Sequence, residues 1–154
     1  MNKNSNSLKR VQKFIEESCN ISSRKIAFKH INRKLFDAEN YIIHLHLDKR
    51  EENITYLMAY LYANELGDFN SGLTIGQSFN NLVNLNKSNV EYFWRICRCD
   101  DREDLIHEIM IMSNRFKKNN LKINLTKLYN NVYYWGNRVT REWKRDFPKA
   151  LDHV

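Results

Sequence analysis

Apolar residues recur at helical spacing through most of the chain, and the clearest run lies near the C-terminus. At roughly 100° per residue, positions three and four apart share one face of a helix. One face of this run is aromatic and aliphatic, with Trp135, Val139, Trp143 and Phe147. The other face is basic, with Arg138, Arg141, Lys144 and Arg145. We therefore expect a helix that buries its aromatic row in a core and exposes a basic ridge.

The same spacing predicts further helices towards the N-terminus. A first helix is expected over about 8–18, after a frayed tail at 1–7. A second helix is expected to begin at the turn residues Ser22 or Ser23. A strong helix begins at Arg50 and is expected to end at a glycine, which is Gly67.

Capping residues mark helix starts in the second half of the chain. They are Thr74, the Ser88–Glu91 capping box, and Asp100 or Asp101. Residues 117–120 are expected to form a turn. The last apolar run reaches back to about residue 124, and the pair Gly136-Asn137 is expected to kink or divide it.

These elements predict an all-α fold, a compact bundle of about seven to nine helices. The segment 41–47 is the ambiguous part, because its alternation favours a strand that has no evident partner; we expect an extended or short helical link there. The chain is expected to be one domain over 1–154. A possible division into an N-terminal subdomain at 8–67 and a C-terminal subdomain at 73–150 follows from the loop-like stretch 67–72.

Composition agrees with a helical globular domain. Hydrophobic residues make up 42% and charged residues 28% of the 154 positions, and one proline with four glycines is too few for a turn-rich β or α/β fold. The N-terminus is polar, without the apolar core of a signal peptide, and no run is long enough to span a membrane. We therefore expect a cytoplasmic, reducing compartment in which all three cysteines are free thiols.

Patterns typical of active sites are weak in this sequence. Cys97-x-Cys99 is one residue short of the usual zinc pair, and His44-x-His46 would share a face only on a strand. The acids of 100–104 would suit a magnesium-dependent nuclease, but capping and the helix dipole account for them more simply. We expect no catalytic residues, no metal, no cofactor and no small-molecule substrate.

The basic residues are the strongest functional signal. The net charge is +7 with a pI near 9.3, and nucleic acid is the commonest partner of such a surface. Guanidinium groups suit phosphate oxygens without reading base sequence. The candidate nucleic-acid-binding residues are Arg24, Lys25, Arg50, Arg95, Arg98, Arg102, Arg138, Arg141 and Arg145.

Four stretches together resemble the CasB family, the small subunit of the type I-E CRISPR surveillance complex, Cascade. Residues 71–79 are similar to the family's short Leu-Gly helix, and 93–100 to its Phe-x-Arg-Leu-Leu-Arg-Ala stretch. Residues 125–134 are similar to the helix that precedes its tryptophan. Trp135 with 139–147 resembles the closing Trp…Val-x-x-x-Trp-x-x-Asp-Phe signature. The resemblance covers about 71–147 in detail and the N-terminal half only by helix pattern and charge.

The resemblance implies a non-enzymatic helical subunit present in two head-to-tail copies beside the Cascade backbone and large subunits. It would support the hybrid of guide RNA and target DNA and hold the displaced DNA strand on a basic surface. By motif, Arg98 corresponds to the second arginine of the family's Arg-x-x-Arg element, and Arg138 to a basic position after the tryptophan. Lys25 and Arg50 correspond loosely to basic N-terminal positions, and Arg102 lies near a family arginine.

Two other functions stay open on the sequence alone. One is a helical scaffold or adaptor whose basic faces bind acidic protein partners. The other is a metal-dependent nuclease that uses the acids of 100–104.

Overall fold

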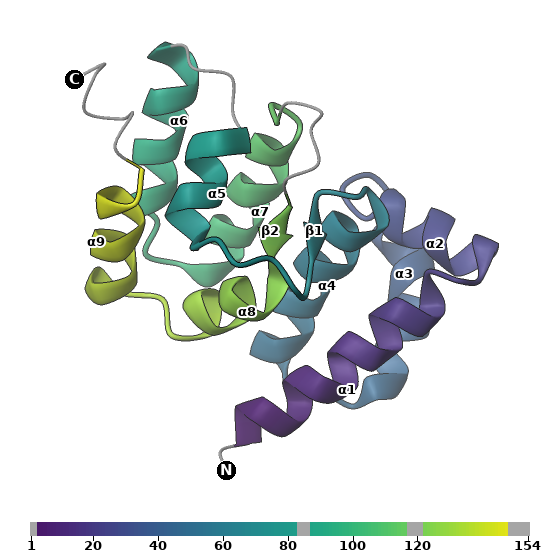
Figure 1. Cartoon of the computed structure of the whole chain (residues 1–154). Helices are drawn as coiled ribbons and strands as arrows, with labels where there is room; N and C mark the ends of the chain where they lie inside the picture. The colour runs from purple at the N-terminus through teal and green to yellow at the C-terminus, as the bar shows by residue number, and fades with distance from the viewer. Residues whose placement is uncertain (1–2, 83–86, 117–121, 148–154) are drawn as a thin grey trace.

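The computed structural model describes residues 3–82, 87–116 and 122–147, and the side chains of 3–5 lie outside that description. Its described part holds nine α-helices, so the expected all-α bundle of about seven to nine helices is confirmed (Figure 1). The helices are α1 (Lys3–Ser18), α2 (Ser22–Lys29), α3 (Leu35–Ile42), α4 (Lys49–Ala63), α5 (Ile75–Leu82), α6 (Lys87–Cys97), α7 (Arg102–Ser113), α8 (Leu125–Tyr133) and α9 (Asn137–Arg145).

Helix α4 is the centre of the fold. It packs against α1, α2 and α3 from the first half of the chain and against α7 and α8 from the second (Figure 1). A helix with neighbours on every side must be apolar nearly all round, and α4 is buried continuously from Ile54 to Leu61. Its start is fixed by Asp48, whose carboxylate accepts a hydrogen bond from the Glu51 N–H at 2.8 Å. Apolar side chains from both halves therefore form one connected core, and the expected subdomain division stays a prediction.

The aromatic row of α9 is buried, as its spacing predicts. Val139 and Trp143 are 1% and 2% exposed, and Phe147 is fully buried just beyond the helix end. Phe147 stacks on Phe93 of α6 with ring centroids 4.1 Å apart, and Trp143 meets Phe79 of α5 edge-on at 5.4 Å. These contacts hold α9 against α5 and α6 (Figure 1).

The expected division at Gly136-Asn137 is confirmed. Helix α8 ends at Tyr133 and α9 begins at Asn137, with Gly136 in extended backbone at φ 170°. The break takes Trp135 out of the α9 row, so this side chain lies in the link and is half-buried. Two further expected caps are also present: Thr74 Oγ1 accepts from the Gln77 N–H at the start of α5, and Asp101 accepts from the Glu103 N–H at the start of α7.

Gly67 does not end a helix, contrary to expectation. Helix α4 stops at Ala63, and Glu65 takes the left-handed conformation at φ 61°. Gly67 instead lies in strand β1 (Gly67–Asp68), which pairs in parallel with β2 (Ile123–Asn124). A Cβ at Gly67 would lie 2.6 Å from Leu125 Cδ2, so close packing explains the glycine here.

Several local expectations are also corrected. The first helix begins at Lys3, because Leu8 and Ser7 are already buried against the core. Ile21 occupies the N-cap position of α2, and neither Ser22 nor Ser23 caps it. By contrast, the short helical link expected within 41–47 is confirmed, as a 3₁₀ helix over Ile43–Leu45. 

The prediction that a Ser88–Glu91 capping box opens a helix is wrong, because α6 already begins at Lys87. The turn expected at 117–120 lies outside the described residues. No described helix combines the length and the apolar character that crossing a membrane requires.

Candidate nucleic-acid interface

Two helices present adjoining basic surfaces on the side of the molecule opposite α2. Helix α6 buries Val90, Phe93 and Ile96, which turns Arg95 and Arg98 outward. Helix α9 packs against α6 and exposes its own cations. We call this surface the α6–α9 basic face, made of Arg95, Arg98, Arg138, Arg141, Lys144 and Arg145.

A contact at the helix junction joins the two halves of this face. The Lys144 ammonium lies 5.5 Å from the ring centroid of Trp94. Burial raises the pKa of the Cys97 thiol to about 12, against the opposing effects of Lys144 from α9 and of Arg98, the residue that follows α6. Cys97 itself is protonated at neutral pH and belongs to the core, as its place on the apolar row predicts.

The cations of the face differ in their partners. Arg95 lies 3.8 Å from a carboxylate oxygen of Glu108, and Arg145 lies 3.4 Å from Asp146. The Arg145 side chain is 72% exposed, so its ion pair holds it only weakly. Arg98, Arg138 and Arg141 are exposed and form no ion pair with any residue that the structure describes. Their charges are available to an external anion.

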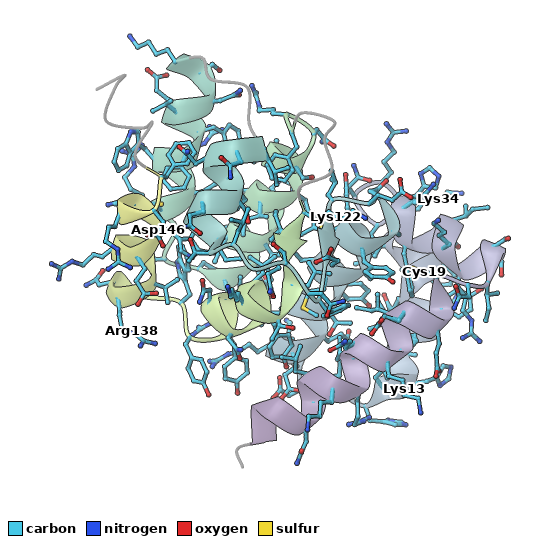
Figure 2. The ribbon with its side chains drawn as sticks, viewed as in Figure 1. Lys13, Cys19, Lys34, Lys122, Arg138 and Asp146 are labelled. Atoms are coloured by element: carbon cyan, nitrogen blue, oxygen red, sulfur yellow. The ribbon has the colours of Figure 1, made fainter. Side chains whose placement is uncertain are left out.

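The link that carries Arg98 is joined to the link that precedes Arg138. Trp135 Nε1 donates a hydrogen bond to the carbonyl oxygen of Cys99 at 2.6 Å. Cys99 follows Arg98 directly, and Arg138 follows Trp135 by three residues. Figure 2 shows Arg138 at the outer side of α9, pointing away from the body of the molecule.

A second basic group lies at the N-termini of α4 and α7. Arg50 and Arg102 line a surface cavity of about 530 Å³ together with Lys49 and Asn53. The Arg50 guanidinium lies 5.0 Å from the ring centroid of Tyr133. Burial lowers the pKa of Arg102, and neighbouring Arg50 lowers it further.

Arg102 is already engaged within the protein. Its Nε donates to the carbonyl oxygens of Val132 and Tyr133, both at 3.2 Å, and its Nη2 donates to Tyr133 at 3.0 Å. These carbonyls end α8, where unpaired carbonyls and the helix dipole favour a cation. The structure thus gives Arg102 a role in closing α8, and its contact with nucleic acid stays a prediction.

The acids beside this cavity have structural partners. Asp101 caps α7, and Glu103 pairs with Lys49 at 3.7 Å and accepts from Asn53 at 3.4 Å. Over the described part of the chain, no three His, Cys, Asp or Glu side chains are grouped in a way that would hold a metal ion.

The third basic group is separate from the others. Arg24 and Lys25 are half-buried on α2, which Figure 1 places across the molecule from α6 and α9. The Arg24 guanidinium lies 5.1 Å from the ring centroid of Tyr41. The structure therefore brings together the cations of α6 with those of α9, and Arg50 with Arg102, but leaves the α2 pair apart.

One basic residue at the surface was missed by the sequence reasoning. Arg115, just beyond α7, lies 5.2 Å from the ring centroid of Tyr92 on α6. The contact exists because α6 and α7 pack together, and no periodicity within either helix signals it.

Together, the helical fold and the uncompensated cations define a small basic α-helical protein with an exposed arginine surface. The family model for CRISPR-associated protein Cse2 matches residues 24–147. The crystal structure of CasB from Thermus thermophilus has the same fold, with a TM-score of 0.73 and 17% identity over 96% of this chain and 99% of that one. The sequence has no significant match among curated proteins.

The family match covers most of the chain, so the protein belongs to the Cse2, or CasB, family of CRISPR-associated proteins. The resemblance noted in the sequence is confirmed. Membership makes the protein a subunit of the multiprotein CRISPR complex Cascade.

Proposed function

We propose that the protein is the non-catalytic small subunit of Cascade and binds nucleic-acid backbone without reading sequence. In this role it stabilises the R-loop by holding the displaced DNA strand and supporting the hybrid of guide RNA and target DNA. Exchange of DNA–DNA for RNA–DNA pairing is nearly balanced in energy, so a few phosphate contacts are enough to shift it. Its proposed protein partners are a second copy of the chain and the backbone and large subunits of Cascade. The proposal places the protein in the cytoplasm.

The observation that carries this proposal is the α6–α9 basic face. Three exposed arginines, Arg98, Arg138 and Arg141, lack carboxylate partners among the described residues. Arg138 and Arg141 lie on α9 and Arg98 directly follows α6, and buried aromatic contacts fix both helices. Little order therefore has to be gained when an anion binds. Exposed guanidinium groups on rigid helices fit phosphate oxygens and distinguish neither bases nor sequence.

The proposal is tested by R-loop lifetime in reconstituted Cascade. Complexes carry either the wild-type subunit or the variant Arg98→Ala, Arg138→Ala, and permanganate reactivity reports the opened DNA strand. We expect the variant subunit to assemble normally and the R-loop to close several-fold faster, because phosphate contacts to the displaced strand are lost. An R-loop that persists equally long in both complexes contradicts the proposal.

One observation favours a second candidate function, the binding of protein partners. Helices α2 and α3 and the link after α3 expose large apolar side chains: Ile26 at 57%, Leu35 at 44%, Phe36 at 72% and Ile43 at 50%. Exposed apolar side chains close together are typical of protein interfaces. An adaptor that binds acidic proteins through its basic faces would also fit the net charge of +7.

Nuclease treatment separates the two functions. If co-purified partners stay bound to the isolated chain after nuclease digestion and the chain binds no DNA, the adaptor function is supported. Magnesium-dependent cleavage of nucleic acid by the isolated chain would instead support the metal-dependent nuclease function that the acids of 100–104 suggest.

A further inference from the structure

Two arginines share one aromatic ring at the outer side of α6 and α7. The guanidinium carbon of Arg95 lies 4.1 Å from the ring centroid of Tyr92, and that of Arg115 lies 5.2 Å from it. The two carbons are therefore separated by no more than the sum of these distances, about 9 Å. We call this arrangement the Tyr92 clamp.

The ring that holds the two arginines is itself fixed. Tyr92 is only 7% exposed, and its hydroxyl donates a hydrogen bond to Glu108. Arg115 also donates to Asn89 Oδ1 at 3.2 Å. Cation–π contact and these hydrogen bonds restrict both guanidinium groups while their outer N–H groups face solvent. A ligand that binds here loses little side-chain entropy in ordering them.

The charge of the clamp is not balanced by the residues that the structure describes. Glu108 is the carboxylate that pairs with Arg95, and it also accepts the Tyr92 hydroxyl. Arg115 forms no ion pair with any described residue, and its hydrogen-bond partner Asn89 is neutral. Among the described residues, the two guanidinium groups have one ion-pair partner between them, the Glu108 carboxylate on Arg95, which leaves a net positive charge for an anion.

We infer that the Tyr92 clamp is a phosphate-binding site for the backbone of single-stranded nucleic acid. This inference rests on the proposed function, because Arg95 belongs both to the clamp and to the α6–α9 basic face. Arg98 follows one helical turn after Arg95, so a strand on that face continues along α6 to Arg115. A guanidinium fork can hold two phosphate oxygens at once, which a lysine cannot do.

The test uses the full-length chain and a fluorescein-labelled oligothymidylate, with anisotropy measured over a series of salt concentrations. Four variants are compared with wild type: the double variant Arg95→Ala, Arg115→Ala; the single variants Arg115→Ala and Arg115→Lys; and Arg33→Ala. Arg33 is an exposed arginine between α2 and α3, so its variant controls for the loss of one positive charge elsewhere. Helicity and urea unfolding are measured for each variant.

We expect each lost clamp arginine to weaken binding about fivefold and to lower the salt slope by about 0.7, the value for one phosphate on a single strand. Arg115→Lys is expected to lose most of the affinity that Arg115→Ala loses, although it keeps the charge. Arg33→Ala is expected to leave the slope unchanged.

The outcomes separate this inference from the function on which it rests. If wild type binds with a salt-dependent affinity and the double variant keeps the wild-type slope, the clamp is not a phosphate site and the proposed function stands. If wild type itself does not bind the oligonucleotide, both the clamp inference and the proposed function are wrong. If the double variant loses an acidic protein partner and keeps its DNA binding, the clamp is a protein contact and the inference is overturned.

Discussion

A hydrogen bond between Trp135 and Cys99 connects the chain segments next to Arg98 and Arg138, two of the predicted nucleic-acid contacts. The indole Nε1 donates to the Cys99 carbonyl oxygen at 2.6 Å, which connects the link after α6 with the link between α8 and α9. Arg98 lies on the first of these segments and Arg138 follows the second. The bond therefore fixes the spacing of two arginines that are 40 positions apart in the sequence.

Trp135→Phe should remove this hydrogen bond and keep most of the ring packing. We expect a loss of about 1–2 kcal/mol in the free energy of unfolding, because the Cys99 carbonyl is left without its donor. Oligothymidylate affinity should fall as well, since Arg98 and Arg138 are then held less firmly. Urea unfolding and fluorescence anisotropy measure the two effects, and unchanged stability would show that the bond contributes nothing.

Gly76 is expected to be intolerant of any side chain. A Cβ at this position would lie 2.6 Å from both the Trp143 carbonyl oxygen and Asp146 Cβ, because α5 and α9 pack closely here. Gly76→Ala should therefore cost about 1–3 kcal/mol of stability through overpacking. Gly72→Ala is the matched control, because a Cβ there meets nothing within 4 Å. Equal stability of the two variants in urea would contradict this packing.

Arg102→Ala should destabilise the fold, unlike alanine substitutions of the exposed arginines. It removes the hydrogen bonds to the Val132 and Tyr133 carbonyls at the end of α8. We expect a loss of about 1.5–3 kcal/mol, the range for hydrogen bonds made by charged groups. Arg138→Ala is the control and should change the free energy of unfolding by less than about 0.5 kcal/mol. If both variants unfold at the same urea concentration, Arg102 is not structural.

Tyr129 gives a prediction for alkaline stability. Its hydroxyl is buried and has no hydrogen-bond partner among the described residues, and burial raises its pKa above the usual value, with Glu51 and Asp48 adding to the effect. Above about pH 10 the unfolded chain releases the phenolic proton while the folded chain retains it, so stability falls as pH rises.

Tyr129→Phe should keep or slightly raise stability at neutral pH and should reduce the loss of stability at about pH 10.5. Tyr134→Phe is the control, because the Tyr134 side chain is 51% exposed. Urea unfolding at the two pH values measures the effect. Identical pH dependence in wild type and Tyr129→Phe would show that burial of this phenol does not oppose its ionisation.

Local patterns predicted much of the fold, and contacts between distant segments account for what was missed. The burial of Val139 and Trp143 follows from helical spacing alone, and the cap at Asp101 follows from its position before an apolar run. Gly67 was misread because its role depends on pairing with Ile123, which is far away in sequence. Trp135 shares the spacing of the α9 row but lies before the helix begins.

The candidate site was predictable to a similar extent. The exposure of Arg138 follows from the apolar face of α9, and that of Arg98 from the apolar face of α6, which ends one residue before it. The engagement of Arg102 with the end of α8 does not, because it requires the packing of α7 on α8. The contact of Arg115 with Tyr92 depends in the same way on the packing of α6 on α7.

The central claim is that the α6–α9 basic face binds nucleic-acid backbone through Arg98 and Arg138. Its most direct test is the salt dependence of oligothymidylate binding by the variant Arg98→Ala, Arg138→Ala, with helicity checked by circular dichroism. We predict unchanged helicity, weaker binding and a slope of log affinity against log salt that is smaller by about 1.4, which corresponds to two phosphate contacts on a single strand. A slope equal to that of wild type would contradict the claim.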